Sequence, residues 1–116
     1  MSGHVLIIED EILIALELEC LLTDLGFATF DVADSPTGAL VCAEAHRPDL
    51  ITADYRIIGG TGVDAVAVIR ASIGHVPVIY VTSNADLVAS EGQPVVEKPI
   101  GLRPLASACH RVGAAA

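Results

Sequence analysis

Short apolar runs alternate along the chain with longer segments that have helical spacing. Continuous apolar runs occur at residues 5–8, 50–53 and 76–81, a weaker extended stretch covers 28–32, and a very short one covers 95–96. Runs of this length that are rich in β-branched residues are typical of strands buried on both faces of a sheet. The pattern therefore predicts five strands.

The first helical segment follows the first run and carries one apolar stripe. Its members lie at i, i+4, i+7, i+8 and i+11: Ile14, Leu18, Leu21, Leu22 and Leu25. Gly26 comes next, and glycine is a typical residue for ending a helix. A second helix is predicted to begin with Ser35 as the N-cap and Pro36 at the first helical position, and to end before Pro48.

Two further helices are predicted, over about 63–72 and from about 102 or 103 onward. Alternation of strands and helices repeated about five times indicates a parallel sheet with helices on both faces. Right-handed crossovers leave few topologies, and the flavodoxin-like one has the strand order 2-1-3-4-5 with its site at the carboxyl ends of the strands. We therefore predict an α/β, doubly wound (βα)5 fold, and we expect its chemistry directly after the apolar runs.

The composition is that of one compact domain, and we predict a single domain over residues 1–116. Hydrophobic residues make up 53% of the chain and the mean hydropathy is +0.62, so the chain can bury a core. The net charge of −9 argues against a large phosphate-backbone footprint, so direct nucleic-acid binding is not expected. No apolar run approaches the roughly 18 residues of a membrane span, and the N-terminus has no signal-peptide pattern. We expect a cytoplasmic protein without a membrane partner.

The cysteines and histidines are interpreted in structural terms. The cysteines all lie in helical segments without metal-ligand spacing and are interpreted as small buried hydrophobic residues: Cys20, Cys42 and Cys109. The histidines lie near strand starts and helix ends, where surface or capping roles are expected: His4, His46, His75 and His110.

Polar residues follow four of the five predicted strands. The acidic triplet 9–11 follows the first run, Asp54 follows the third, Thr82 follows the fourth, and Glu97-Lys98 follows the fifth. Because the carboxyl ends of parallel strands converge at one edge, we expect a cluster of two or three carboxylates, one hydroxyl and one ammonium. Crowded carboxylates repel unless a cation neutralises them or one takes up a proton. A small set of hard oxygen ligands suits Mg²⁺.

A Mg²⁺ ion beside a carboxylate favours phosphoryl chemistry, which depends on positioning and charge neutralisation. Asp54 is then the candidate nucleophile, which would form an aspartyl phosphate. Thr82 and Lys98 are placed to contact the phosphoryl oxygens. Each residue alone has an ordinary alternative, since an aspartate after a strand is usually a turn or cap residue. Their order at the ends of four strands is what favours the site.

In these motifs the sequence resembles the receiver domains of two-component response regulators. The resemblance covers essentially the whole chain. It rests on VLIIEDE at 5–11, on Asp54 followed eight residues later by Gly62, on VTS at 81–83 and on EKP at 97–99. It implies a phosphorylated signalling domain rather than an enzyme.

The resemblance also implies a set of metal ligands. Asp10 would bind Mg²⁺ directly, and Glu9 would bind it directly or through water. Asp54 and the backbone carbonyl of Arg56 would complete the site. The loop after Asp54 departs from the family pattern, because Ile58 stands where a proline is usual. Arg56, two residues past the acceptor, could steer hydrolysis of the phosphoryl group.

Roles in signalling are implied as well. Asp54 would take its phosphoryl group from a histidine kinase or a histidine phosphotransfer protein. Thr82 would move toward the phosphoryl oxygen, and Lys98 would pair with it, with the Lys98-Pro99 peptide in cis.

The relay of the signal departs from the family pattern. The stretch between Thr82 and Lys98 is short, so the fourth helix is predicted to be short or irregular. Val95 stands where the family normally has its switch aromatic. No effector domain follows the last helix in this sequence, so the domain is expected to act alone or to belong to a larger protein.

The working hypothesis is a phosphorylation switch whose fourth helix, fifth strand and fifth helix are read by a downstream protein target or effector domain. The alternative is a pseudo-receiver that acts through constitutive contacts without phosphorylation. A small Mg²⁺ phosphatase is disfavoured, because Asp54 is followed by Tyr55-Arg56 and the chain leaves no room for a substrate-covering cap. A flavodoxin-type cofactor binder is disfavoured, because no phosphate loop follows the first predicted strand.

Overall fold

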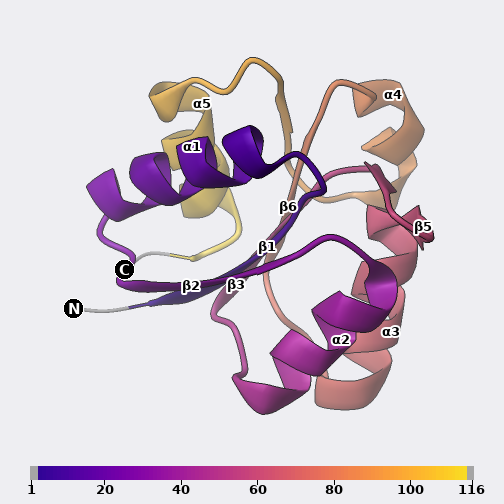
Figure 1. Cartoon of the computed structure of the whole chain (residues 1–116). Coiled ribbons are helices and arrows are strands. Elements are labelled where there is room, and N and C mark those ends of the chain that lie inside the picture. The colour runs from indigo at the N-terminus through magenta and orange to yellow at the C-terminus, as the bar shows by residue number, and fades with distance from the viewer. Residues whose placement is uncertain (1–2, 115–116) are drawn as a thin grey trace.

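The computed structural model describes residues 3–114, which form three layers, with one sheet between two layers of helices (Figure 1). The sheet of this described part has five parallel strands: β1 (His4–Ile8), β2 (Thr29–Ala33), β3 (Leu50–Ala53), β6 (Val78–Thr82) and β7 (Val95–Glu97). Their order is β2-β1-β3-β6-β7. This is the predicted order 2-1-3-4-5, so the flavodoxin-like α/β fold is confirmed.

Helices cover both faces of the sheet: α1 (Ile12–Asp24), α2 (Pro36–Ala45), α3 (Gly62–Ile73), α4 (Ala85–Val88) and α5 (Leu102–Arg111). Helices α1 and α5 lie on one face, and α2 and α3 lie on the other (Figure 1). Val88 of α4 packs into the core on the α2–α3 side. Within residues 3–114, no helix is long and apolar enough to cross a membrane.

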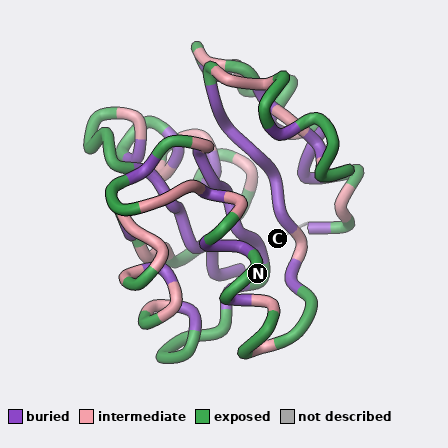
Figure 2. Tube along the Cα trace, turned by 90° about the vertical axis from the view of Figure 1, so that its right-hand side faces the viewer, coloured by how far each residue is buried: buried purple, intermediate pink, exposed green. Residues whose placement is uncertain are grey.

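The buried strands send alternate side chains into two cores. In β1, Val5 and Ile7 pack with α1 and α5, whereas Leu6 and Ile8 pack with α2 and α3. Burial on both faces explains why the strands read as continuous apolar runs. Figure 2 shows buried positions along the central strands and exposed positions in the helices and loops.

The helix ends follow the local signals in the sequence. The Ser35 hydroxyl accepts a hydrogen bond from Gly38 N at 3.1 Å, and Pro36 begins α2, as predicted. Gly26 follows α1 with a φ of 103°, a conformation that favours glycine. The predicted stripe of α1 packs into the α1–α5 core, but three other apolar residues of this helix are exposed: Ile12, Leu13 and Leu16.

Two short segments complete the carboxyl side of the sheet. Helix α4 has four residues and continues into a 3-10 turn, η1 (Ala89–Glu91), so the prediction of a short or irregular fourth helix is confirmed. After β3, the chain forms a small hairpin of β4 (Arg56–Ile57) and β5 (Gly60–Thr61) that was not predicted. Gly59 has a φ of 76° in its two-residue turn. Strands of two residues are too short for a sequence period to reveal.

The interpretation of the cysteines is partly wrong. Cys109 is buried, as expected, and the burial raises the pKa of its thiol to about 11. Cys20 is exposed, because it lies off the stripe by which α1 packs on the sheet. A cysteine in a helix is therefore not buried unless it falls on the packing face.

The expected surface or capping role of His4 is also wrong. The His4 side chain is only 5% exposed. The reason is that β1 begins at His4, so this side chain lies in the same row as Leu6 and Ile8, which pack with α2 and α3. His46, by contrast, is the exposed C-cap residue of α2, as expected.

Candidate metal centre at the carboxyl edge of the sheet

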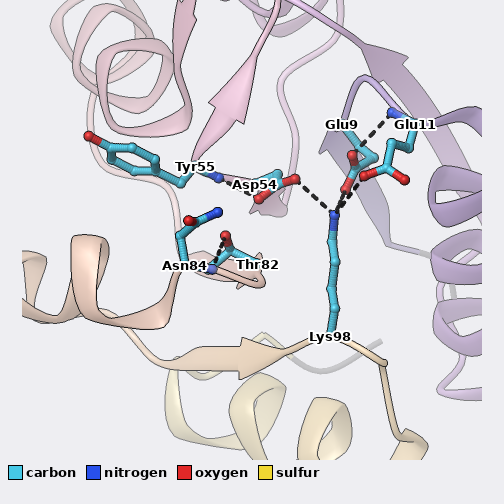
Figure 3. A network of polar contacts seen from close by, with 7 residues as sticks. All are labelled: Glu9, Glu11, Asp54, Tyr55, Thr82, Asn84 and Lys98. Atoms are coloured by element: carbon cyan, nitrogen blue, oxygen red, sulfur yellow. Dashed lines mark hydrogen bonds and ion pairs between the residues drawn. The ribbon is translucent and has the colours of Figure 1, made fainter.

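Four chain segments meet at the carboxyl edge of the sheet (Figure 3). Glu9 follows β1, Asp54 follows β3, Thr82 ends β6 and Lys98 follows β7. Backbone bonds hold the segments in register beyond the strands. Asp54 N donates to Ile8 O at 3.0 Å, and Lys98 N donates to Thr82 O at 3.2 Å. The sheet therefore brings together residues that lie up to 89 positions apart in sequence.

The ammonium group of Lys98 lies at the centre of the cluster. Its Nζ is 2.8 Å from Asp54 Oδ2, 2.9 Å from Glu9 Oε1 and 3.8 Å from Glu11 Oε1. The Lys98 side chain is only 10% exposed, so water screens these contacts little. The sequence predicted that Lys98 would pair with a phosphoryl group. In the structure, Lys98 forms ion pairs with carboxylates that follow two different strands.

Both carboxylate oxygens of Asp54 have a donor. Oδ1 accepts a hydrogen bond from Tyr55 N at 2.7 Å, and Oδ2 accepts one from Lys98 Nζ at 2.8 Å. The loop behind Asp54 is tight, because a Cβ at Gly62 would lie 1.9 Å from the backbone oxygen of Asp54. Gly62 N also donates to Tyr55 O at 2.8 Å. The glycine eight residues after Asp54 is thus a steric requirement of this loop.

Glu9 is the most deeply buried carboxylate of the cluster, at 3% exposure. Its Oε2 accepts a hydrogen bond from Glu11 N at 3.1 Å. Its Oε1 lies 2.9 Å from Lys98 Nζ in a charge contact without hydrogen-bond geometry, and it has no other partner within residues 3–114. A buried carboxylate oxygen whose one partner is an ammonium group is suited to contact a cation.

Burial and charge shift the pKa values of Glu9 and Lys98. Burial raises the pKa of Glu9 to about 6, against the opposing contacts with Lys98 and the Glu11 amide, and the charge of Asp54 adds to the rise. Burial alone would lower the pKa of Lys98, but its contacts with Asp54 and Glu9 outweigh burial and raise it. The site therefore holds a stable positive charge next to a carboxylate whose pKa is about 6.

The remaining acidic residues extend the set of oxygen ligands. Glu9, Asp10, Glu11 and Asp54 each offer a carboxylate oxygen, and these atoms lie within 4.8 Å of one another. Asp10 and Glu11 are exposed, so water reaches the cluster from their side. An all-oxygen set with water access fits Mg²⁺.

The predicted role of Arg56 stays a prediction. Its backbone belongs to β4, and no contact links its carbonyl to the carboxylates in the described part of the chain. Its guanidinium lies over the Tyr55 ring, 5.8 Å from the centroid. The side chain therefore stands beside the loop after Asp54, where the sequence places it.

Thr82 is fully buried and is tied to the start of α4. Its Oγ1 accepts a hydrogen bond from Asn84 N at 3.0 Å, and Asn84 is the residue before α4 (Figure 3). The structure thus brings Thr82 to the predicted edge without a hydrogen bond from its hydroxyl to Asp54 or Lys98, in the part of the chain described. The Lys98–Pro99 peptide is cis, as the resemblance implied.

Sequence reasoning did not find the backbone donors of the site. Amide groups of Glu11, Tyr55 and Asn84 hold Glu9, Asp54 and Thr82. Every residue except proline has such an N–H group, so the residue type does not indicate which amides act as donors in the site.

Comparison with known proteins agrees with this fold and site. Residues 5–109 match the family model of the response regulator receiver domain. The chain is 42% identical over 85 residues to the phyllosphere-induced regulator PhyR of Methylorubrum extorquens, which covers 72% of this chain and 32% of that protein. The receiver domain of PhyR from Erythrobacter litoralis has a TM-score of 0.83 and 32% identity, covering 96% of this chain and 89% of that domain.

A third comparison concerns the metal. The receiver domain of the sensor histidine kinase PA1611 from Pseudomonas aeruginosa has a TM-score of 0.82 and 25% identity, covering 97% of this chain and 99% of that domain. It was solved with a magnesium ion coordinated in its active-site cleft.

The chain therefore belongs to the response regulator receiver domain family of two-component signalling. Receiver domains are signalling modules that interact with kinases or phosphotransfer proteins, and their family binds Mg²⁺ in the active site. The chain spans about a third of the length of the curated relative PhyR (32%).

Proposed function

We propose that Asp54 accepts a phosphoryl group with the help of Mg²⁺ and that this reaction switches a protein-binding surface. One observation carries the proposal: a buried aspartate at a strand end is held by Lys98 within a cluster of four carboxylates. The residues proposed to hold Mg²⁺ are Glu9, Asp10, Asp54 and the backbone carbonyl of Arg56.

The proposed reaction is a transfer from a phosphohistidine. A carboxylate oxygen of Asp54 attacks the phosphorus atom, and the N–P bond breaks as the O–P bond forms. The imidazole of the donor leaves with the electron pair of the N–P bond. Bound Mg²⁺ supplies charge neutralisation for the phosphoryl oxygens.

Lys98 is the residue that rearranges most easily during this transfer. Both oxygens of Asp54 have a donor, so one contact has to pass from the carboxylate to the new phosphoryl oxygens. The Tyr55 amide is fixed in the backbone, whereas the lysine ammonium lies on a flexible four-carbon stem. Lys98 would release Asp54 Oδ2 and pair with the phosphoryl group, which carries about 1.5 to 2 negative charges.

The signal would leave the site through Thr82 and α4. A phosphoryl oxygen on Asp54 would accept a hydrogen bond from the Thr82 hydroxyl, and movement of Thr82 toward it would lengthen the bond that Thr82 Oγ1 now accepts from Asn84 N at 3.0 Å. Asn84 is the residue directly before the short α4, so this movement changes the start of that helix. Such a route needs no aromatic residue at position 95, which is Val95 here.

The partner proposed to deliver the phosphoryl group is a histidine kinase or a histidine phosphotransfer protein. Such a donor has to bring its imidazole to Asp54 and therefore contacts the surface beside Asp10. The exposed apolar residues Ile12, Leu13 and Leu16 lie on the first turns of α1, directly after the acidic loop. An apolar patch at the mouth of a charged site supports a protein donor. The expected cytoplasmic location stays a prediction.

The test is the intact mass of the untagged chain after incubation with Mg²⁺ and a small phosphodonor. One added phosphoryl group is expected in the wild type, and none in Asp54→Asn. An unchanged wild-type mass, or equal labelling of the variant, would refute the proposal. A parallel reaction without Mg²⁺ tests whether labelling requires the metal. Circular dichroism of the same sample shows whether the chain is still folded without Mg²⁺.

The pseudo-receiver alternative is favoured by one contact. Lys98 already offsets part of the charge of Glu9 and Asp54, so the cluster has a counterion within the chain itself. A site of this kind needs no Mg²⁺. Titration with Mg²⁺ distinguishes the two functions: a phosphoacceptor binds the ion and loses the binding in Asp54→Asn, whereas a pseudo-receiver shows no such binding.

A further inference from the structure

A second group of metal-ligating side chains lies far from the carboxyl edge. His4 begins β1, Asp31 lies in β2, and His46 is the C-cap residue of α2. One ligand atom from each lies within 4.8 Å of the other two. His4 and Ile8 are the two ends of β1, about 13 Å apart at the usual strand rise, so this group is separate from the Mg²⁺ candidate site.

The strand register explains why these residues meet. His4 pairs with Thr29 in the parallel ladder between β1 and β2. Asp31 is two residues further along β2 and therefore lies on the same face of the sheet. The end of α2 lies over this face and brings the ring of His46 onto the ring of His4, with centroids 3.6 Å apart and planes 11° from parallel.

Both nitrogens of the buried His4 ring have a polar neighbour. Nδ1 is 2.8 Å from Thr29 Oγ1, and Nε2 is 3.0 Å from Asp31 Oδ2. When the Nδ1–H group donates to Thr29, the lone pair of Nε2 faces a carboxylate oxygen. This tautomer leaves a place for a cation between the two atoms, whereas in the other tautomer Nε2–H donates to Asp31 and the Thr29 hydroxyl donates to Nδ1. In metal sites, the second ring nitrogen of a ligating histidine commonly donates to a carboxylate, a backbone carbonyl or water, and in the first tautomer the Thr29 hydroxyl oxygen takes that place.

The type of ligand indicates the type of ion. Two imidazoles and one carboxylate suit Zn²⁺ and similar transition ions, whereas Mg²⁺ prefers oxygen ligands alone. Zinc bonds of about 2.0–2.1 Å place neighbouring ligand atoms roughly 3.3 Å apart in a tetrahedral site. The separation of His4 Nε2 and Asp31 Oδ2, 3.0 Å, is close to this value.

His46 has to turn for the site to form. A metal ion lies in the plane of each imidazole that binds it, and the two rings are stacked in parallel. His46 is exposed, and its ring has no hydrogen-bond partner among residues 3–114. A rotation of this side chain therefore costs little beyond the stacking contact.

We propose that His4, Asp31 and His46 form a binding site for Zn²⁺ or a similar divalent transition-metal ion, with water completing the coordination. The ion joins the end of α2 to β1 and to the edge strand β2. Binding to the folded chain alone stabilises it in proportion to the logarithm of the free metal concentration. Thr29 is a positioning residue, because it orients the His4 ring.

The experiment titrates untagged, reduced protein with Zn²⁺ in the presence of saturating Mg²⁺ and follows the heat of binding. Each of His46→Gln and Asp31→Asn is expected to weaken zinc binding roughly tenfold or more, since even indirect partners of a metal ligand contribute 10–100-fold. His46 and Asp31 are not in the core, so these variants are expected to fold, which circular dichroism checks. Two control variants at exposed positions, His110→Gln and Cys20→Ser, are expected to bind zinc like the wild type.

A second readout assigns the ligands. Imidazole nitrogen resonances of His4 and His46 are expected to shift on addition of one equivalent of Zn²⁺, while those of His75 and His110 stay in place. The proposal is overturned if the wild type binds no zinc, if His46→Gln and Asp31→Asn bind as tightly as the wild type, or if Cys20→Ser removes the binding.

Discussion

Replacing Lys98 with methionine removes the cation that Glu9 and Asp54 share and keeps most of the apolar stem of the side chain. Loss of one partner from a buried ion pair costs about 3–5 kcal/mol, because the remaining charge has no counterion. The exposed fractions are 10% for the Lys98 side chain, 3% for Glu9 and 7% for Asp54, so water relieves little of this cost. Glu9 has a pKa of about 6 and can take up a proton when the lysine is lost. A protonated Glu9 needs no counterion, so the cost should lie at the lower end of the range of about 3–5 kcal/mol. We expect the free energy of unfolding to fall by about 3 kcal/mol at pH 7 without Mg²⁺.

The assay is urea unfolding followed by far-UV circular dichroism in the presence of a chelator. Arg103→Met is the matched control, because Arg103 is an exposed residue of α5 and its loss changes the net charge equally. A change within about 0.5 kcal/mol is expected for this control. Saturating Mg²⁺ or a pH near 5 should reduce the difference in unfolding free energy between Lys98→Met and the wild type, since the metal ion or protons then neutralise the carboxylates. Equal losses in the two variants, or a loss that neither Mg²⁺ nor acid reduces, would refute the reasoning.

Three further predictions concern other parts of the site. Because the pKa of Glu9 is higher in the folded chain, its protonation stabilises the wild type by about 2 kcal/mol below pH 4.5, and this contribution is lost as the pH rises through about 6. In the presence of a chelator, Glu9→Gln should therefore flatten the dependence of the unfolding free energy on pH in this range. An unchanged slope in the variant would assign the pH dependence to another group. Gly62→Ala should lower the free energy of unfolding by about 1–3 kcal/mol in urea titrations, because its Cβ would meet the Asp54 carbonyl oxygen, and wild-type stability would contradict that contact. Leu13→Ser should slow phosphotransfer from a histidine phosphotransfer protein roughly tenfold while labelling by a small phosphodonor stays the same, because Leu13 is 77% exposed beside the acidic loop. Val68→Ser, an exposed change on the opposite face, should leave both rates unchanged.

Local signals in the sequence account for the elements and for the residue types at the strand ends. Continuous apolar runs predicted the buried strands, because a strand covered on both faces has no polar side. Ser35 and Pro36 marked the start of α2 through backbone chemistry that depends on neighbouring residues alone. The short stretch before Lys98 likewise indicated the reduced fourth helix, since the four residues of α4 and a 3-10 turn are its helical segments.

Local signals in the sequence did not predict contacts between segments that are distant along the chain. The hairpin of β4 and β5, the backbone donors of the site and the burial of His4 each depend on where a neighbouring segment packs. Exposure of Cys20 follows the same rule, because only the orientation of α1 decides which of its faces meets the core.

By itself, the sequence determined the alternation of strands and helices and the presence of acids, a hydroxyl and a lysine after the strands, because these are properties of neighbouring residues. Only the tertiary structure decided that Lys98 bridges Glu9 and Asp54, and that His4 lies between Asp31 and His46. The physical reason is that strand register and helix packing set distances between segments 25 to 89 residues apart in the chain, and these depend on the whole fold at once.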